Sequence, residues 1–126
     1  MTDCVPKYEP LPEWTQEEME EVVRRGDPRE VALVPLVAGL SPPDCDWAQS
    51  ICRQLAQYPD SSVRGNAIIG FGYLAMTCRK LQEDIARPMI EAGMQDEDEW
   101  VRVQSEDAAE MCTNYLNWKF PCKNIE

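Results

Sequence analysis

The chain of 126 residues contains no histidine. Histidine is the commonest general base and metal ligand near neutral pH, so its absence excludes Ser-His-Asp and Cys-His mechanisms. No Cys-x-x-Cys pair is present either, and a zinc site assembled from Cys4, Cys45 and Cys122 is only a minor alternative without histidine to complete it. We therefore expect no cofactor, no bound metal and no catalytic residues.

Basic residues are also few. The chain has 12 Lys and Arg against 23 Asp and Glu, which gives a net charge of −11. Such a chain repels phosphate backbones and anionic lipids, so nucleic acids and membrane surfaces are poor candidate partners. No apolar run approaches the roughly 18 residues of a spanning helix, and no basic flank precedes an apolar N-terminal segment. We expect a cytoplasmic protein.

Six cysteines would suggest a disulfide framework in a small secreted protein. Without a signal peptide we expect free thiols instead, with Cys52, Cys78 and Cys112 acting as small buried hydrophobic residues. Paired carboxylates remain as possible catalysts, but such pairs need one carboxyl group in an apolar cleft. Here the carboxylates lie in polar runs, so Glu106 and Glu110 fit a solvated face or a binding surface better than catalysis.

Local signals predict six helices and no strand. Pro6, Pro10 and Pro12 favour an extended arm over residues 1–13, followed by a single helical domain over 14–126. Capping patterns and apolar spacing divide this domain. The predicted helices cover about residues 16–25, 27–40, 44–58, 61–79, 83–94 and 98–118. The fourth helix is apolar on almost all sides, which indicates a central position. Pro35 and Pro88 should bend the helices that contain them.

One segment occurs twice. Asp60-Ser-Ser-Val63-Arg64 and Asp98-Glu-Trp-Val101-Arg102 begin two of these helices at an offset of 98 − 60 = 38 residues. Each copy consists of an amphipathic helix, a polar turn with Asp, and a second helix that begins near Val-Arg. Small residues recur within the second helices, as close helix packing requires. This pattern predicts an all-α solenoid of helical pairs.

The doubled Asp-x-x-Val-Arg, the proline in the first helix of a pair and the spacing near 40 resemble the HEAT-repeat family. The resemblance covers about residues 27–118 and implies a short right-handed solenoid. It also implies that Asp60, Arg64, Asp98 and Arg102 form a structural ladder of hydrogen bonds between neighbouring repeats. With two clear copies plus an N-terminal helix pair, the solenoid is very short for a macromolecular scaffold.

A further resemblance suggests a function. The phrase Val63-Arg-Gly-Asn66-Ala67-Ile-Ile-Gly-Phe-Gly72, with a Trp near the end, is similar to small HEAT-like bacterial proteins, some of which look like immunity proteins encoded beside secreted toxins. The resemblance implies a monomer that neutralises a cognate basic toxin domain by covering its active site. The alternative is a general HEAT-like adaptor or assembly subunit with no toxin partner.

The predicted partner-binding surface lies on the last helix and the groove beside it. Its acidic members carry charge that would attract a basic partner, and polar residues of the preceding second helix face the same groove. A second acidic cluster lies on the first helix. The candidate residues are Glu99, Glu106, Asp107 and Glu110, with Asn66 and Tyr73 across the groove, and Glu17, Glu18 and Glu21 on the first helix.

Overall fold

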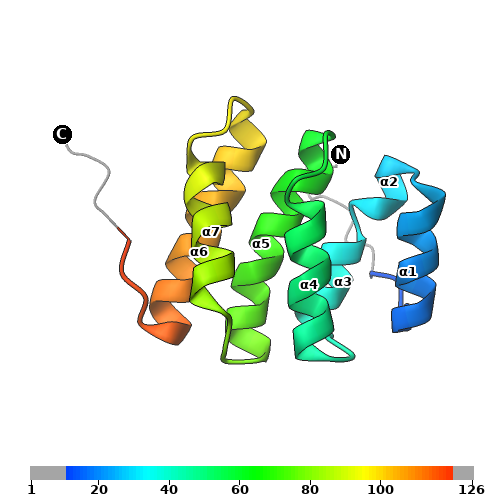
Figure 1. The fold of residues 1–126 in the computed structure, drawn as a ribbon, viewed down its shortest axis with the longest axis horizontal. Helices are drawn as coiled ribbons and strands as arrows, with labels where there is room; N and C mark the ends of the chain where they lie inside the picture. The colour runs from blue at the N-terminus through cyan, green and yellow to red at the C-terminus, as the bar shows by residue number, and fades with distance from the viewer. Residues whose placement is uncertain (1–10, 121–126) are drawn as a thin grey trace, which may run out of the picture.

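The computed structural model describes residues 11–120, and these form seven helices and no strand (Figure 1). The all-α prediction is confirmed. In that part of the chain, no helix has both the length and the apolar character that crossing a membrane requires. Most of the predicted N-terminal arm, together with Cys4 and Cys122, lies outside the described residues. The helices are α1 (Gln16–Arg25), α2 (Pro28–Val31), α3 (Val34–Leu40), α4 (Cys45–Leu55), α5 (Ser61–Thr77), α6 (Glu83–Met94) and α7 (Glu99–Leu116).

Side-chain caps begin most of these helices. Thr15 and Glu18 form the predicted capping box, in which each side chain accepts a hydrogen bond from the other residue's backbone N–H. Gly26 then ends α1 in the left-handed conformation, with φ of 78°. Aspartate caps the helices α2, α4, α5 and α7. Local sequence therefore fixes most helix starts.

The predicted helix over residues 27–40 is divided in two. Ala32 and Leu33 interrupt it, and Pro35 lies in the first turn of α3. Proline has no backbone N–H and its ring clashes with the carbonyl of the residue four positions earlier, here Val31. The helix therefore ends at Val31 and restarts where proline is tolerated. Pro88, in contrast, lies inside α6, which continues through it.

The helices form two layers (Figure 1). The helices α3, α5 and α7 lie side by side in one layer, while α4 and α6 cover them in the other and α1 lies at the N-terminal end. The central helix is α5, which packs against α3, α4, α6 and α7. Its apolar residues are buried on all sides, with Phe71 and Leu74 in the core. The predicted central position is confirmed.

Cys45 and Cys78 form a disulfide bond, with Cα atoms 6.2 Å apart. The expectation of free thiols is therefore wrong for this pair. Because α4 and α5 are antiparallel neighbours, the first residue of α4 lies beside the residue that follows α5. Cys52 and Cys112 are free and buried as expected, and burial raises the pKa of each thiol to about 12.

Candidate protein-binding surface

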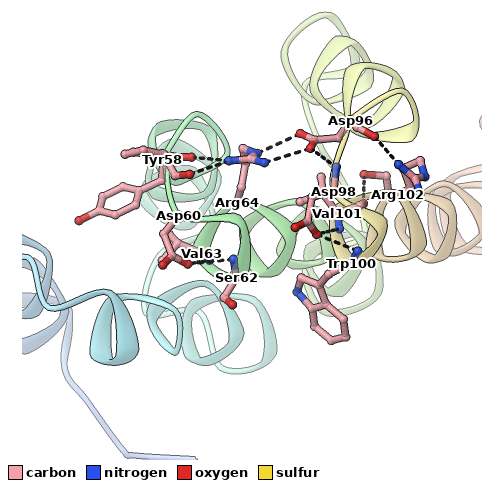
Figure 2. Close-up of polar contacts among 12 residues, drawn as sticks. Tyr58, Asp60, Ser62, Val63, Arg64, Asp96, Asp98, Trp100, Val101 and Arg102 are labelled. Carbon is pink, nitrogen blue, oxygen red and sulfur yellow. Dashed lines mark hydrogen bonds and ion pairs between the residues drawn. The ribbon is translucent and has the colours of Figure 1, made fainter.

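Hydrogen bonds of Arg64 and Arg102 to Asp96 join the two repeats at one end of the stack (Figure 2). We call these three residues the polar array. Arg64 donates from Nε and Nη2 to the carboxylate of Asp96 at 2.9 and 3.0 Å. Its Nη1 donates to the backbone carbonyls of Tyr58 and Pro59 at 3.1 and 2.9 Å. The side chains of Arg64 and Asp96 are 18% and 17% exposed. Arg64 is therefore engaged on all sides within the chain.

The two repeated aspartates serve mainly as helix caps. Asp60 accepts from the N–H groups of Ser62 and Val63, and Asp98 accepts from those of Trp100 and Val101. This function follows from their position before each second helix.

The acid that bridges the repeats is Asp96, which the sequence analysis did not select. Its carboxylate also accepts from the N–H of Asp98 at 2.9 Å, and its carbonyl accepts from Arg102 Nη1 at 2.8 Å. The hydrogen bond from Arg64 lowers the pKa of Asp96 and raises the pKa of Arg64. Asp96 belongs to the acidic run Asp96-Glu-Asp98-Glu99, in which local sequence gives no reason to prefer it.

The four acids predicted on α7 lie on two sides of that helix. Glu99, Glu106 and Glu110, together with Val103, follow helical spacing along one exposed stripe. We call these four residues the terminal edge. Asp107 lies two turns after Trp100 and shares the face of that residue instead.

The repeat offset of 38 accounts for the position of the terminal edge. Val103, Glu106 and Glu110 correspond to Gly65, Ile68 and Gly72 of α5, which are all buried. Gly65 and Gly72 lie directly against side chains of α7. In α7 the same positions face solvent, and two of the three carry charge. A polar outer side of this kind ends a helical stack and prevents another repeat from adding to it.

The two predicted residues on α5 have contacts within the fold. Asn66 donates from Nδ2 to the carbonyl of Ala32 at 2.9 Å. Tyr73 is half-buried, and its Cβ lies 2.9 Å from the position that a Cβ on Gly39 would occupy. Both residues therefore lie on the side of α5 that faces α2 and α3, whereas the acids lie on α7 (Figure 1).

The acids of α1 are partly engaged within the chain. Glu18 belongs to the capping box, and Glu21 forms ion pairs with Arg24 and Arg25. Glu20 accepts a hydrogen bond from the indole of Trp47 at 3.0 Å. Glu17 is exposed. Neighbouring arginines therefore offset part of the charge of this N-terminal cluster.

Three exposed apolar residues of α7, Trp100, Val103 and Tyr115, were not among the predicted site residues. Trp100 and Val103 are 48% and 44% exposed. They could have been found from their spacing, because they fall outside the buried positions Val101, Ser105 and Ala108 of the same helix. An exposed tryptophan beside acidic residues is typical of a protein-binding surface.

One cleft of about 240 Å³ between α4, α5 and α6 is lined mostly by apolar groups, and its charged members are Arg64 and Asp96, which bind each other. Among residues 11–120, no three Cys, Asp or Glu side chains gather in a way that could hold a metal ion.

Comparison with solved structures gives a match that covers most of the chain. No family model and no curated protein matches the chain. A chain in the crystal structure of a CDI complex from Cupriavidus taiwanensis LMG 19424 is similar in structure, with a TM-score of 0.76 and 20% sequence identity. The match covers 88% of this chain and 98% of that chain. At this identity the likeness establishes a shared fold.

Proposed function

We propose that this protein is an immunity protein that binds a cognate toxin domain and neutralises it. The observation that carries the proposal is the fold shared with nearly the whole of a chain from a CDI complex, because such complexes pair a toxin with its immunity protein. We further propose that the protein acts in the cytoplasm as a HEAT-like monomer, without catalysis, by covering the toxin's active site.

The charge of the chain supports a basic partner. With a net charge of −11, the protein attracts positively charged surfaces and accelerates their encounter. A toxin domain that cuts nucleic acid needs a basic surface to hold its substrate. An acidic protein that binds this surface also blocks access of the nucleic acid to the active site.

We place the binding surface on α7. Its acids Glu99, Glu106, Asp107 and Glu110 are exposed, and the two basic residues of α5 and α7, Arg64 and Arg102, donate to Asp96 in the polar array. The residues of the terminal edge are exposed, so a partner can reach their side chains.

Co-expression tests the function directly. If a large secreted protein is encoded beside this chain in its host, the partner to use is the C-terminal domain of that protein, expressed from an inducible promoter. We expect growth to stop when the domain is expressed alone and to resume when this chain is present, with the two copurifying as a complex. A general adaptor would give neither protection nor a stable complex, and that result would reject the proposal.

A further inference from the structure

Trp100 lies on the outside of α7, with its indole against α5. The residue is 48% exposed, and the Cδ1 atom of its ring lies 2.7 Å from the position that a Cβ on Gly65 would occupy. Any side chain at position 65 would therefore displace the ring. The glycine leaves room for the Cδ1–Nε1 edge of the indole against α5, while the residue remains half-exposed. A large, rigid, half-exposed aromatic residue is the usual centre of a protein-binding site.

Arginine side chains lie over the other aromatic rings near the C-terminal end. The guanidinium of Arg79 lies 5.1 Å from the ring centre of Tyr115, and that of Arg87 lies 4.6 Å from the ring centre of Phe120. Trp100 has no such cation among residues 11–120, nor does its indole N–H have an acceptor there. Tryptophan is nevertheless the aromatic residue that attracts cations most strongly.

No basic side chain of α5 or α7 is available to cover this ring. These two helices contain one arginine each, Arg64 and Arg102, and both donate to Asp96 in the polar array. Figure 2 shows Trp100 pointing away from that array. The nearby charges on α7 are instead acidic, since Glu99 precedes Trp100 and Asp107 follows it by two turns on the same face.

We propose that Trp100 is the recognition anchor for an arginine side chain of the toxin, which stacks on the indole on the face of α7 that also carries the carboxylate of Asp107. The identity of the partner rests on the proposed function, whereas the chemistry rests on this surface. Arginine fits better than lysine because its planar guanidinium can stack on the ring and donate to a carboxylate at the same time. A second copy of this acidic chain would bring like charges together at the same place.

A peptide titration tests the anchor without the toxin. The probe is acetylated octa-arginine, and octa-lysine of equal charge is the comparison. Each indole N–H of the four tryptophans gives its own NMR signal in the 15N-labelled protein. We expect saturable shifts of the Trp100 signal, little change for Trp47, whose N–H is bonded to Glu20, and tighter binding of octa-arginine than of octa-lysine.

Variants then separate stacking from general charge attraction. Trp100→Ala should weaken octa-arginine binding about 5- to 30-fold, the range expected for loss of a cation–π contact. Leu40→Ala is the matched control, because it removes another exposed apolar side chain at the end of α3, a helix that does not contact α7. We expect it to bind as the parent does. Helical circular dichroism must be equal in the parent and both variants.

Two results would overturn the anchor. One is octa-arginine binding that is unchanged in Trp100→Ala, and the other is equal binding of octa-lysine, which would indicate charge attraction alone. A different result would reject the proposed function. If the parent binds octa-arginine through Trp100 but gives no protection in co-expression, the anchor stands and the immunity function is rejected. If the parent protects and Trp100→Ala protects equally well, the anchor is rejected and the function stands.

Discussion

Arg64 spans the boundary between two helix pairs and donates two hydrogen bonds to Asp96, 32 residues further along the chain. Through Nη1 the same guanidinium also binds the turn that precedes α5. One side chain thus connects α5, the turn that precedes it and the segment around Asp96. The planar shape of the guanidinium is needed for its two parallel hydrogen bonds to the carboxylate.

Replacing Arg64 by Ala should lower the free energy of unfolding by about 1–3 kcal/mol, because the charge of Asp96 stays largely buried without its partner. Arg102→Ala should lower the free energy of unfolding by less, because Arg102 donates only one hydrogen bond in the polar array, to the backbone carbonyl of Asp96. Urea unfolding of both variants measures the difference. Equal stability of the parent and Arg64→Ala would show that the array does not hold the repeats together.

The same contact makes stability depend on pH. The hydrogen bond from Arg64 holds the pKa of Asp96 below its ordinary value of 3.8. Because the pKa is lower in the folded state, the stabilisation is fully present above the unfolded-state value and is lost as the pH falls through the folded-state value. We expect Asp96→Asn to have a lower free energy of unfolding than the parent at pH 7. This difference between the two proteins should become smaller below about pH 4. A difference that stays constant down to pH 2 would contradict this assignment.

The disulfide should contribute measurably to stability. Cys45 and Cys78 are 33 residues apart, and closing a loop of this length in the unfolded chain stabilises a protein by at most about 3–4 kcal/mol. We expect dithiothreitol to lower the urea midpoint of the parent. Dithiothreitol should not change the urea midpoint of the double variant Cys45→Ser with Cys78→Ser. A midpoint of the parent that does not respond to reductant would show that the bond contributes nothing.

Most of the fold could be predicted because its signals are local. Thr15 and Glu18 lie three residues apart, and Asp60 and Asp98 cap helices that begin at the next residue. The apolar character of α5 likewise predicts a central helix from its own sequence. The break before α3 was missed because a proline can either bend a helix or restart it, and only the packing around Val31 and Pro35 decides between them.

The candidate site was harder to predict because it depends on contacts between distant segments. The sequence does not indicate which acid of the run over residues 96–99 meets Arg64, nor that Cys45 lies beside Cys78. The spacing of Trp100 indicates its exposure, but the contact of its indole with Gly65 depends on how α7 packs on α5. The acids of α7 were predictable, since their spacing leaves them outside the buried stripe. Whether they bind a partner stays a prediction.

The contact between α6 and α7 should tolerate no added side chain at Gly93. A Cβ at this position would lie 2.0 Å from Ser105 Oγ, whose hydroxyl is hydrogen-bonded to the carbonyl of Val101. We expect Gly93→Ala to destabilise the protein by about 1–3 kcal/mol through overpacking. Ser105→Ala should recover part of this loss, because it removes the clashing oxygen. Urea unfolding of the single and double variants measures the coupling, and strictly additive effects would contradict the clash.

Charge reversal distinguishes the two acidic surfaces as binding sites. Glu106→Lys with Glu110→Lys changes the terminal edge, and Glu17→Lys with Glu21→Lys changes α1 by the same net charge. If the toxin binds α7, the first pair should slow association and abolish protection, while the second should reduce the association rate only modestly through the change in total charge. Association measured by surface plasmon resonance at two salt concentrations should also be slower at high salt, because screening limits electrostatic attraction to about 8 Å at physiological ionic strength. Loss of protection in the α1 pair alone would move the interface to the N-terminal end of the stack.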